Sequence, residues 1–396
     1  MPMIWPQLTT HRVRWTSGVD GLVVPSRRAR REVPDHYDAS VVPFVAAAGL
    51  RLDGDLAADL DDAARQLTAF DSGGAGEIAP FATVLLRSES AASSQIENLT
   101  SSARALAEAA IGQGSRANAT VILANVSTMQ AALDLAGSLD TATVLAMHRA
   151  LMSHQRLHEP GQWRDQQVWL GGAASHPAGA AYVPPVAADV PALMDDLVAL
   201  MDRDDLPPLA LAALAHAQFE TIHPFTDGNG RTGRALLHSV LLHTGVIHRV
   251  TVPISAGLLA DRDGYFAALT AYRQGDPEPI LRCVAEAART GTRVGGLLVA
   301  RLRALRAGWD EVVTARRGAA VWPLLDLVLR QPVVTARVVS DELAVSTPTA
   351  QAALQHAVDA GVLVESTGHR RNRVYRSTKV LLALDDYAES LGRRGG

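Results

Sequence analysis

The sequence contains one cysteine, Cys283, and one lysine, Lys379, among its 396 residues. A single cysteine excludes an intrachain disulfide framework and favours a reducing compartment, so we expect a cytoplasmic protein. The other basic side chains, apart from histidine, are arginines, and their combination with abundant alanine indicates a GC-rich, bacterial genome.

Long apolar runs and a strong net charge are also missing. No stretch reaches the roughly 18 uncharged apolar residues of a membrane-spanning helix, and the first ten residues lack the pattern of a signal peptide. The 37 basic and 41 acidic side chains leave a net charge of −4, which gives no global signal for nucleic acid. With 48% hydrophobic and 20% charged residues, the chain can form a sizeable core, and its length allows two or three domains.

The segment of residues 223–234 concentrates more chemistry than any other part of the chain. It reads His-Pro-Phe-Thr-Asp-Gly-Asn-Gly-Arg-Thr-Gly-Arg and lies between two apolar patterns of helical spacing, at residues 209–219 and 235–242. We therefore expect a tight loop whose last residues begin a helix. Gly228 and Gly230 let the backbone turn its N–H groups toward one point, and the dipole of the following helix favours an anion there.

Four side chains of this segment add to the anion site. Arg231 and Arg234 are three residues apart, so they share one helix face and can bind phosphate oxygens bidentately. Asp227 can hold a Mg²⁺ ion that contacts phosphate, and His223 can take up a proton near neutral pH. The segment therefore predicts a polyphosphate site with a metal ligand and a general base beside it.

The string resembles the signature of the Fic family, HxFx(D/E)GNGRxxR, at every specified position. The resemblance implies an adenylyltransferase that moves AMP from ATP to a Ser, Thr or Tyr hydroxyl of a target protein. It makes His223 the catalytic base and Asp227 the ligand of Mg²⁺, for which Mn²⁺ can substitute. The residues that it places on ATP within the signature are Gly228, Asn229, Gly230, Arg231, Thr232, Gly233 and Arg234.

Gly230 helps to choose among the branches of this family. The phosphotransferase branch, Doc, has a lysine at the matching place, so the glycine favours nucleotidyl transfer over phosphoryl transfer. ATP is the favoured donor, while UTP, GTP and CDP-choline stay open as alternatives.

A second segment, residues 93–98, resembles the (S/T)xxxE(G/N) motif of the inhibitory helix that some family members carry N-terminal to the core. Ser93 and Glu97 are four residues apart and thus share one helix face. The resemblance implies that Glu97 pairs with Arg234 and denies it to the γ-phosphate of ATP, with Asn98 completing the motif. An ordinary exposed glutamate is the alternative interpretation.

A third segment covers the side expected to meet the target protein. After Pro-Gly-Gln-Trp-Arg at 160–164, two β-prone runs at 167–172 and 181–185 predict a hairpin. It resembles the family's flap, which lies over the nucleotide and presents a target segment by edge-strand pairing. Core packing of Trp163 and Trp169 is the alternative. The residues that the resemblance places around ATP outside the signature are Leu170, Gly171 and Gly172 on the flap, and Tyr265, Phe266 and Arg273 near the adenine.

Apolar spacing along most of the chain predicts a mainly α fold. Together with the resemblance, it implies a Fic-type helical core, a β-hairpin flap, an N-terminal helical region and a C-terminal winged helix. The expected domains are an N-terminal arm and helical region with the inhibitory helix at 1–112, a catalytic core at 113–295, a connecting helix at 296–317 and a winged-helix-like domain at 318–396. Within the first, residues 1–40 are interrupted by proline and charge, and the basic run of Arg27, Arg28, Arg30 and Arg31 is expected to lie in a coil or arm, as a solvated linker rather than a binding site.

Two further interpretations stay open. In the first, the enzyme is a de-AMPylase in which Glu97 positions a water molecule. In the second, the chain is a DNA-binding regulator that uses residues 347–376 and has the Fic core as its ligand sensor. The proposed wing at 368–376 is basic, as phosphate contacts require, but the proposed recognition helix at 347–358 lacks arginine. Domain packing or homodimer formation is therefore favoured over DNA binding.

Overall fold

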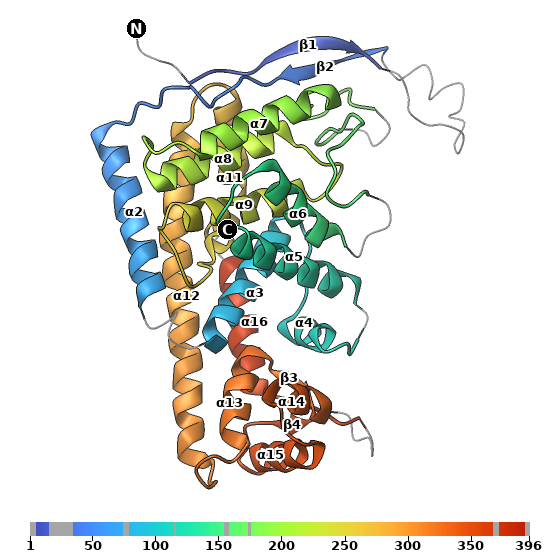
Figure 1. Cartoon of the computed structure of the whole chain (residues 1–396), viewed down its shortest axis with the longest axis vertical. Coiled ribbons are helices and arrows are strands. Elements are labelled where there is room, and N and C mark those ends of the chain that lie inside the picture. Colours follow the sequence, from blue (N-terminus) through green and yellow to red (C-terminus); the bar gives the residue numbers. More distant parts are fainter. Residues whose placement is uncertain are drawn as a thin grey trace.

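The structure is a computed structural model, and it describes residues 5–15, 35–73, 79–114, 116–153, 158–172, 176–366 and 372–392. The described residues are mainly helical, which confirms the predicted fold class. Figure 1 shows a large helical part and a smaller C-terminal part, joined by the long helix α12 (Glu278–Val312). None of the described helices is long and apolar enough to cross a membrane.

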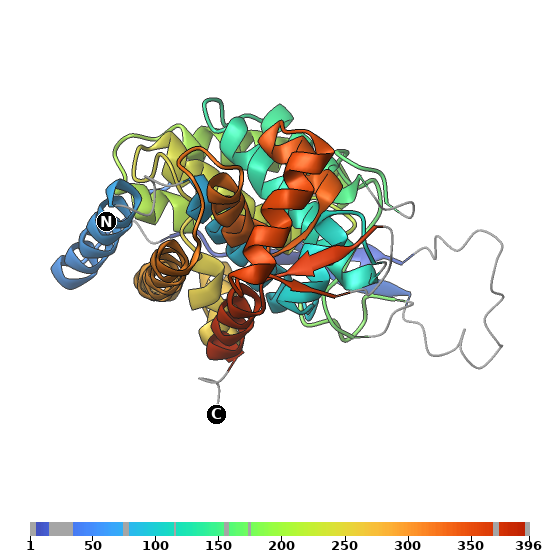
Figure 2. The same cartoon turned by 90° about the horizontal axis from the view of Figure 1, so that it is seen from below.

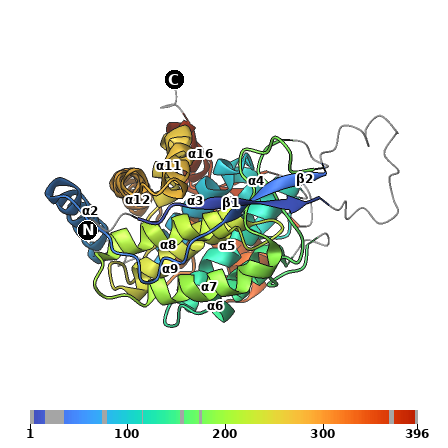
Figure 3. The ribbon, with the colours of Figure 1, turned by 90° about the horizontal axis from the view of Figure 1, so that it is seen from above.

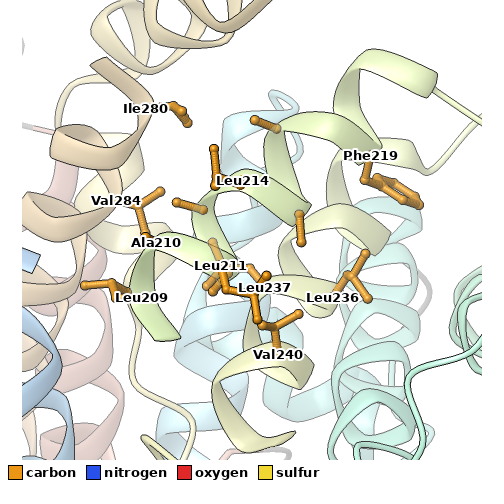
Figure 4. Packing of buried hydrophobic residues seen from close by; sticks show 14 of the residues in the cluster. Leu209, Ala210, Leu211, Leu214, Phe219, Leu236, Leu237, Val240, Ile280 and Val284 are labelled. Carbon is orange, nitrogen blue, oxygen red and sulfur yellow. The ribbon is translucent and has the colours of Figure 1, made fainter. Parts of the chain in front are cut away.

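The centre of the large part is formed by α8 (Pro208–Ile222) and α9 (Asn229–His243), which are joined by the signature loop. Every residue of α8 from Leu209 to Ile222 is buried, as expected for a helix that is apolar on most sides. Figure 4 shows how these helices pack, with Leu211 and Leu214 of α8, Leu237 and Val240 of α9, and Ile280 and Val284 of α12. Because each such side chain contributes roughly 1.5–3 kcal/mol on burial, the loop is held between two firmly packed helices.

Further helices surround this pair. They are α2 (Gly54–Ser72), α3 (Ala79–Ile96), α4 (Ala103–Ala110), α5 (Ala117–Asp134), α6 (Thr141–Met152), α7 (Val190–Met201) after the 3₁₀ turn η1 (Ala187–Asp189), α10 (Ile254–Ala260) and α11 (Arg262–Arg273). Several of these helices begin at an aspartate or serine N-cap. For example, the side chain of Asp53 accepts a hydrogen bond from the Leu56 amide, and that of Asp140 accepts one from the Thr143 amide.

The N-terminal segment contains two strands that were not predicted. Strands β1 (Thr9–Arg14) and β2 (His36–Val41) pair antiparallel, with Thr9 opposite Val41 and Arg14 opposite His36. Figures 1 and 3 show the pair lying across the end of the molecule opposite the C-terminal part. Their pairing was not predicted because the two strands lie far apart in sequence and have no short turn motif between them. The basic run at residues 27–31 lies outside the described residues.

The predicted connecting helix at 296–317 is also corrected. Helix α12 runs without interruption from Glu278 to Val312, so it belongs to the core as much as to the connection. The helix continues through its glycines, which allow it to pack closely on Pro253. A Cβ on Gly291 would lie 2.6 Å from the Pro253 carbonyl oxygen, and one on Gly295 would lie 3.1 Å from Pro253 Cδ.

The described residues of the C-terminal part form four helices and three short strands. These are α13 (Val321–Arg330), β3 (Val333–Thr335), α14 (Ala336–Leu343), α15 (Thr347–Asp359), β4 (Val364–Glu365), β5 (Val374–Arg376) and α16 (Thr378–Gly392). The strands form one sheet in the order β3-β5-β4, and Ser346 caps the start of α15. Figure 2 shows these elements from below. A winged helix stays a prediction for this part of the chain, and residues 368–371 of the predicted wing lie outside the described residues.

Candidate functional site

The signature loop reverses the chain between α8 and α9 by means of two left-handed residues. His223 ends α8 with a φ of 51°, and Gly228 precedes α9 with a φ of 79°. At Gly228 a side chain would also clash, since a Cβ there would lie 2.8 Å from Leu151 Cδ2. Glycine is therefore required at this position, whereas His223 is a bulky residue held in an uncommon conformation at the point where chemistry is expected.

Asn229 closes the loop on itself. Its Oδ1 atom accepts a hydrogen bond from the Phe225 amide at 2.9 Å, and its Nδ2 atom donates to the Phe225 carbonyl oxygen at 2.9 Å. The residue is buried, so both bonds are protected from water. The predicted phosphate contact of Asn229 thus gains a second interpretation, in which its side chain sets the shape of the loop.

Phe225 fastens the loop to the interior. Its ring stacks on His148 with a centroid distance of 3.6 Å and also packs against Trp163 at 5.1 Å. His148 in turn lies 3.1 Å from the Asp227 carbonyl oxygen through Nε2 and accepts from the Gly161 amide. Burial lowers the pKa of His148 to about 4, so the ring is neutral and holds the loop rather than reacting.

His223 is the one imidazole of the loop, and its side chain is 13% exposed. Burial, aided by the positive charges of Arg273 and Arg164, lowers its pKa to about 3. The ring is therefore neutral at pH 7, which is the state that a base requires. Its Nδ1 atom lies 3.8 Å from Glu220 Oε2 and has no hydrogen-bond partner among the described residues.

Glu220 is a site residue that the sequence analysis missed. It lies one helical turn before His223, is buried, and its pKa is raised by burial to about 7. Because the imidazole is neutral, the contact between the two side chains is not an ion pair at neutral pH. The spacing of three residues on one helix was the signal that could have found it.

Arg164 is a second missed residue, and it joins the flap to the loop. Its guanidinium is buried and donates to three carbonyl oxygens: that of His223 at 2.9 Å, that of Gln166 at 3.1 Å and that of Pro185 at 2.6 Å. Burial lowers its pKa to about 10, so it keeps its charge and stabilises the positive-φ turn at His223.

Arg231 and Asp227 lie together at the start of α9. The Arg231 guanidinium is buried, its Nε and Nη1 atoms have no partner among the described residues, and Nη2 lies 3.6 Å from Asp227 Oδ2. A buried guanidinium with unused donors beside a helix N-terminus is suited to bind an anion such as phosphate. The Asp227 side chain is 42% exposed.

The carboxylate of Asp227, the predicted metal ligand, belongs to no larger cluster of metal-binding side chains among the described residues. Within the described part of the chain, no group of three or more His, Cys, Asp or Glu side chains could hold a metal ion. This arrangement fits Mg²⁺, which is commonly held by one or two carboxylates plus substrate phosphate oxygens, and it does not fit a structural zinc.

The second arginine of the signature is already occupied. Arg234 is buried, and its Nη2 atom donates to Glu97 Oε1 at 2.9 Å and to the Ser93 carbonyl oxygen at 2.8 Å. Its Nε atom donates to Ser93 Oγ at 2.8 Å. Burial alone would lower the pKa of Arg234, but the nearby Glu97 raises it, so the guanidinium is firmly charged.

Glu97 also covers the first turn of α9. The contact is so close that any Cβ at Gly230 would collide with Glu97 Oε1 and lie 3.0 Å from Arg234 Nη1. The prediction that Ser93 and Glu97 share one helix face needs a small correction, because α3 ends at Ile96 and Glu97 lies in the turn just beyond it. Asn98 follows with a φ of 61° and accepts a hydrogen bond from Arg262 at 2.8 Å, which ties this turn to α11.

Helix α3 has a second buried attachment to the core. Glu89 is fully buried, and it accepts a hydrogen bond from the Ser255 amide at 2.9 Å and one from the Ser255 hydroxyl. Glu89 Oε1 also lies 3.0 Å from His238 Nε2 on α9. Helices α3 and α9 are therefore joined at two levels, by Glu97 and Ser93 on Arg234 and by Glu89 beside His238.

The predicted flap contains a hairpin with a single bridge instead of two strands. Leu170 pairs antiparallel with Tyr182, and Gly171 and Gly172 have positive φ values of 74° and 75°. Residues 173–175 lie outside the described residues. The strand β2 supports the flap, since the Ser40 amide donates to the Val183 carbonyl oxygen at 3.1 Å. The two tryptophans lie apart: Trp163 packs against Phe225, and Trp169 packs edge-on against Trp15.

The residues expected around adenine are not all on one surface. Tyr265 is buried and its hydroxyl lies 2.8 Å from His216 Nε2, whereas Phe266 is 42% exposed. Arg273 lies over the Tyr182 ring at 3.8 Å and donates to the Glu220 carbonyl oxygen at 3.3 Å. Arg273 thus supports the helix that carries Glu220 and His223, and an adenine contact stays a prediction for all three residues.

Comparison with known proteins agrees with this site. Residues 138–241 match the model of the Fic/DOC family, a range that includes α6, the flap and the signature loop. The chain is 32% identical over 142 residues to "Protein adenylyltransferase Fic" of Nematostella vectensis, which is 36% of this chain and 30% of that protein. It is 34% identical over 143 residues to the protein of the same name from Drosophila willistoni, covering 36% of this chain and 26% of the relative.

The matches therefore span less than a third of the length of these curated relatives. A crystal structure of a Fic family protein from Desulfovibrio desulfuricans G20 shares the fold, with a TM-score of 0.54 and 21% identity over 83% of this chain and 97% of that one. The helix–loop–helix, with its arginines at the helix start, is suited to bind an anion. The chain contains a domain of the Fic/DOC family.

Proposed function

We propose that this chain transfers AMP from ATP to a hydroxyl group of a target protein, and that Glu97 inhibits this transfer in the arrangement described. The observation that carries the proposal is the pairing of Glu97 and Ser93 with Arg234, beside a complete signature loop in which Arg231 keeps unused donors. The relatives' name, protein adenylyltransferase, supports the same chemistry.

His223 acts as the general base. The attacking hydroxyl oxygen forms a bond to the α-phosphorus as its proton passes to the imidazole, and the bond from the α-phosphorus to the bridging oxygen breaks to release pyrophosphate. Because the pKa of His223 lies below the neutral range, the ring is unprotonated there and has a nitrogen free to accept that proton. Glu220, placed 3.8 Å from Nδ1, can stabilise the imidazolium that forms.

The phosphate chain lies over the start of α9. The free amides of its first turn face the α-phosphate, and Arg231 binds the β-phosphate with the donors that no protein group uses. Asp227 would hold Mg²⁺, which neutralises charge on the phosphate oxygens. Arg234 binds the γ-phosphate once Glu97 has left it.

Gly230 supports nucleotidyl transfer in particular. A lysine at this position would collide with Glu97 and approach Arg234, so the glycine and the inhibitory glutamate belong together. The target protein docks on the flap beside Leu170, where the described part of the hairpin contains a single bridge, to Tyr182, and an added strand can pair.

DNA binding is not proposed. The exposed side chains of α15, which include Thr349, Gln351, Gln355 and Asp359, carry no arginine or lysine. Packing of the C-terminal domain on the core, or formation of a homodimer, accounts better for this surface.

Mass spectrometry tests the proposed reaction. The Glu97→Gly variant is incubated with a mixture of ATP, GTP, UTP and CDP-choline, with and without Mg²⁺, and then analysed as intact protein and as peptides. The proposal expects AMP on a Ser, Thr or Tyr of this chain or of an added target. A phosphate or phosphocholine adduct would contradict it, and removal of AMP from a modified target would support the de-AMPylase alternative.

A further inference from the structure

The flap caps the C-terminal end of α8, the helix that leads to His223. A helix leaves its last carbonyl oxygens without partners inside the helix, so other groups must satisfy them. Here the Thr221 carbonyl oxygen accepts from the Tyr182 hydroxyl at 2.6 Å. The His223 carbonyl oxygen accepts from Arg164 Nε at 2.9 Å, and the backbone amide of Arg164 donates to the Pro224 carbonyl oxygen at 2.9 Å. All of these donors lie in the flap or directly before it.

One buried side chain, Arg164, connects this cap to both ends of the flap. Its guanidinium also donates to the carbonyl oxygens of Gln166, just before the first run of the hairpin, and of Pro185, at the end of the second. A guanidinium presents its N–H groups in a fixed planar arrangement, which the ammonium group of a lysine cannot reproduce. Positive charge is also favoured at the C-terminal end of a helix. Arg164 is thus matched to this position in both geometry and charge.

The backbone of His223 is the feature that needs this support. Its φ of 51° lies in the left-handed region, which a residue other than glycine keeps only where its surroundings hold it. The His223 amide donates to the Phe219 carbonyl oxygen at 2.9 Å, and Arg164 holds the His223 carbonyl oxygen. Because the backbone dihedrals limit where a side chain can point, a change at either peptide group would redirect the imidazole.

We propose that Arg164 is a positioning residue of the transfer reaction, because it makes the flap the C-terminal cap of α8 and so makes the flap and His223 move as one unit. A target hydroxyl docked on the flap is then held in a fixed relation to the base. The hydrogen bonds of Arg164 all go to backbone carbonyl oxygens, so it acts through His223 and not on the reacting atoms. The effect on transfer rests on the proposed function, whereas the coupling of the flap to the loop does not.

Hydrogen exchange of the full chain, followed by mass spectrometry, tests the coupling without any activity. Arg164→Met removes the guanidinium and keeps an apolar side chain of similar length. Exchange should become about tenfold faster or more in peptides from residues 181–185 and 219–228 together, since bonds from a charged group are lost at both. Faster exchange in the flap while residues 219–228 keep wild-type protection would overturn the proposal, as would unchanged exchange in both.

Arg203→Met is the matched control. Arg203 also donates to backbone carbonyl oxygens, those of Ala46 at 3.3 Å and Ala48 at 2.5 Å, but far from the signature loop in sequence and outside the site. Its replacement should raise exchange near residues 46–48 and leave residues 219–228 at wild-type protection. If this variant loosens residues 219–228 as much as Arg164→Met does, the effect is general destabilisation and the positioning role is refuted.

Kinetics test the consequence for the reaction, in the Glu97→Gly background. The rate of label transfer from saturating ATP should fall roughly 10²-fold in Arg164→Met, because a misplacement of about 1 Å costs on that order. The affinity for ATP, measured by calorimetry, should stay within about twofold, since the phosphate contacts come from α9. Arg164→Lys keeps the charge but should recover little of the rate. A lysine variant as fast as its parent, or an equal loss of rate and ATP affinity, would contradict the positioning role.

A second variant keeps the test decisive if Arg164→Met does not fold. Tyr182→Phe removes only the hydroxyl that caps Thr221 and keeps the ring beneath Arg273. One hydrogen bond is lost, so transfer should fall roughly fivefold and exchange at residues 219–228 should rise by a similar factor. Wild-type rate and protection in this variant would refute the capping of α8 by the flap. If the Glu97→Gly protein itself transfers no AMP, the proposed function fails, while hydrogen exchange still decides whether Arg164 couples the flap to the loop.

Discussion

Replacing Glu97 by glycine should raise the rate of AMP transfer above that of the wild-type protein, including the rate of transfer to the chain itself. The structure limits the size of the effect. Glu97 accepts one charge-assisted hydrogen bond from Arg234, a type worth ~1.5–3 kcal/mol when buried, but its side chain is 39% exposed. Solvent screening reduces this to about 1–2 kcal/mol, which corresponds to roughly five- to thirtyfold activation. The two bonds from Arg234 to Ser93 remain, so the arginine stays in position for the γ-phosphate.

A series of variants separates charge from volume. Glu97→Gln keeps a side chain of the same size beside Gly230 but removes the charge, so it should activate by less than glycine does. Arg234→Ala should not activate, because it removes the γ-phosphate ligand together with the partner of Glu97. Glu108→Gln breaks a comparable contact, with Arg104 at 2.6 Å, outside the site and should leave the rate unchanged.

The assay is the initial rate of label transfer from ATP to protein, with ATP affinity measured in parallel by calorimetry. The account expects the rate to rise and the affinity for ATP to change little in the glycine variant. Equal rates for wild type, Glu97→Gly and Glu97→Gln would refute the inhibitory role of Glu97.

Three other predictions follow from single residues. His223→Ala should reduce transfer by roughly 10²–10⁴ while ATP still binds, and an undiminished rate would exclude it as the base. Asp227→Ala should abolish transfer and also the effect of Mg²⁺ on the affinity for ATP. If calorimetry shows that the ATP affinity of this variant still responds to Mg²⁺, the metal role is excluded. Burial raises the pKa of Glu220 from 4.5 to about 7, so between these values the folded protein holds a proton that the unfolded chain has lost, and the free energy of unfolding falls as pH rises. In urea denaturation, the free energy of unfolding of Glu220→Gln minus that of the wild type should therefore be larger at pH 8 than at pH 5, by up to about 3 kcal/mol. A difference that does not change with pH would contradict the assigned pKa.

The sequence was most informative where the chemistry is local. Residues 223–234 are consecutive, and the glycine and asparagine that shape their loop act on neighbours within five residues, so the pattern alone predicts the loop, the helix start and the anion site. The contact of Glu97 with Arg234 is far from local, at a separation of 137 residues, and it was predicted only through the resemblance to a family motif.

What the sequence could not provide depends on burial and on long-range packing. The raised pKa of Glu220 comes from its enclosure and not from its spacing to His223. The strands β1 and β2 pair across a long intervening segment, and the glycines of α12 serve close packing on Pro253, so neither feature has a signal within a short window of sequence. The predicted contacts of Leu170 and Phe266 with the nucleotide depend on the position of the flap and on rearrangement of side chains, and they stay predictions.

The most direct test of the central claim compares two positions of the label in ATP. The Glu97→Gly variant, and the same variant with His223→Ala, are incubated with Mg²⁺ and ATP radiolabelled at either the α- or the γ-phosphate. Nucleotidyl transfer predicts protein-bound label from α-labelled ATP, none from γ-labelled ATP, and loss of the signal when His223 is replaced. Label that enters the protein from the γ-phosphate would show phosphoryl transfer and contradict the account.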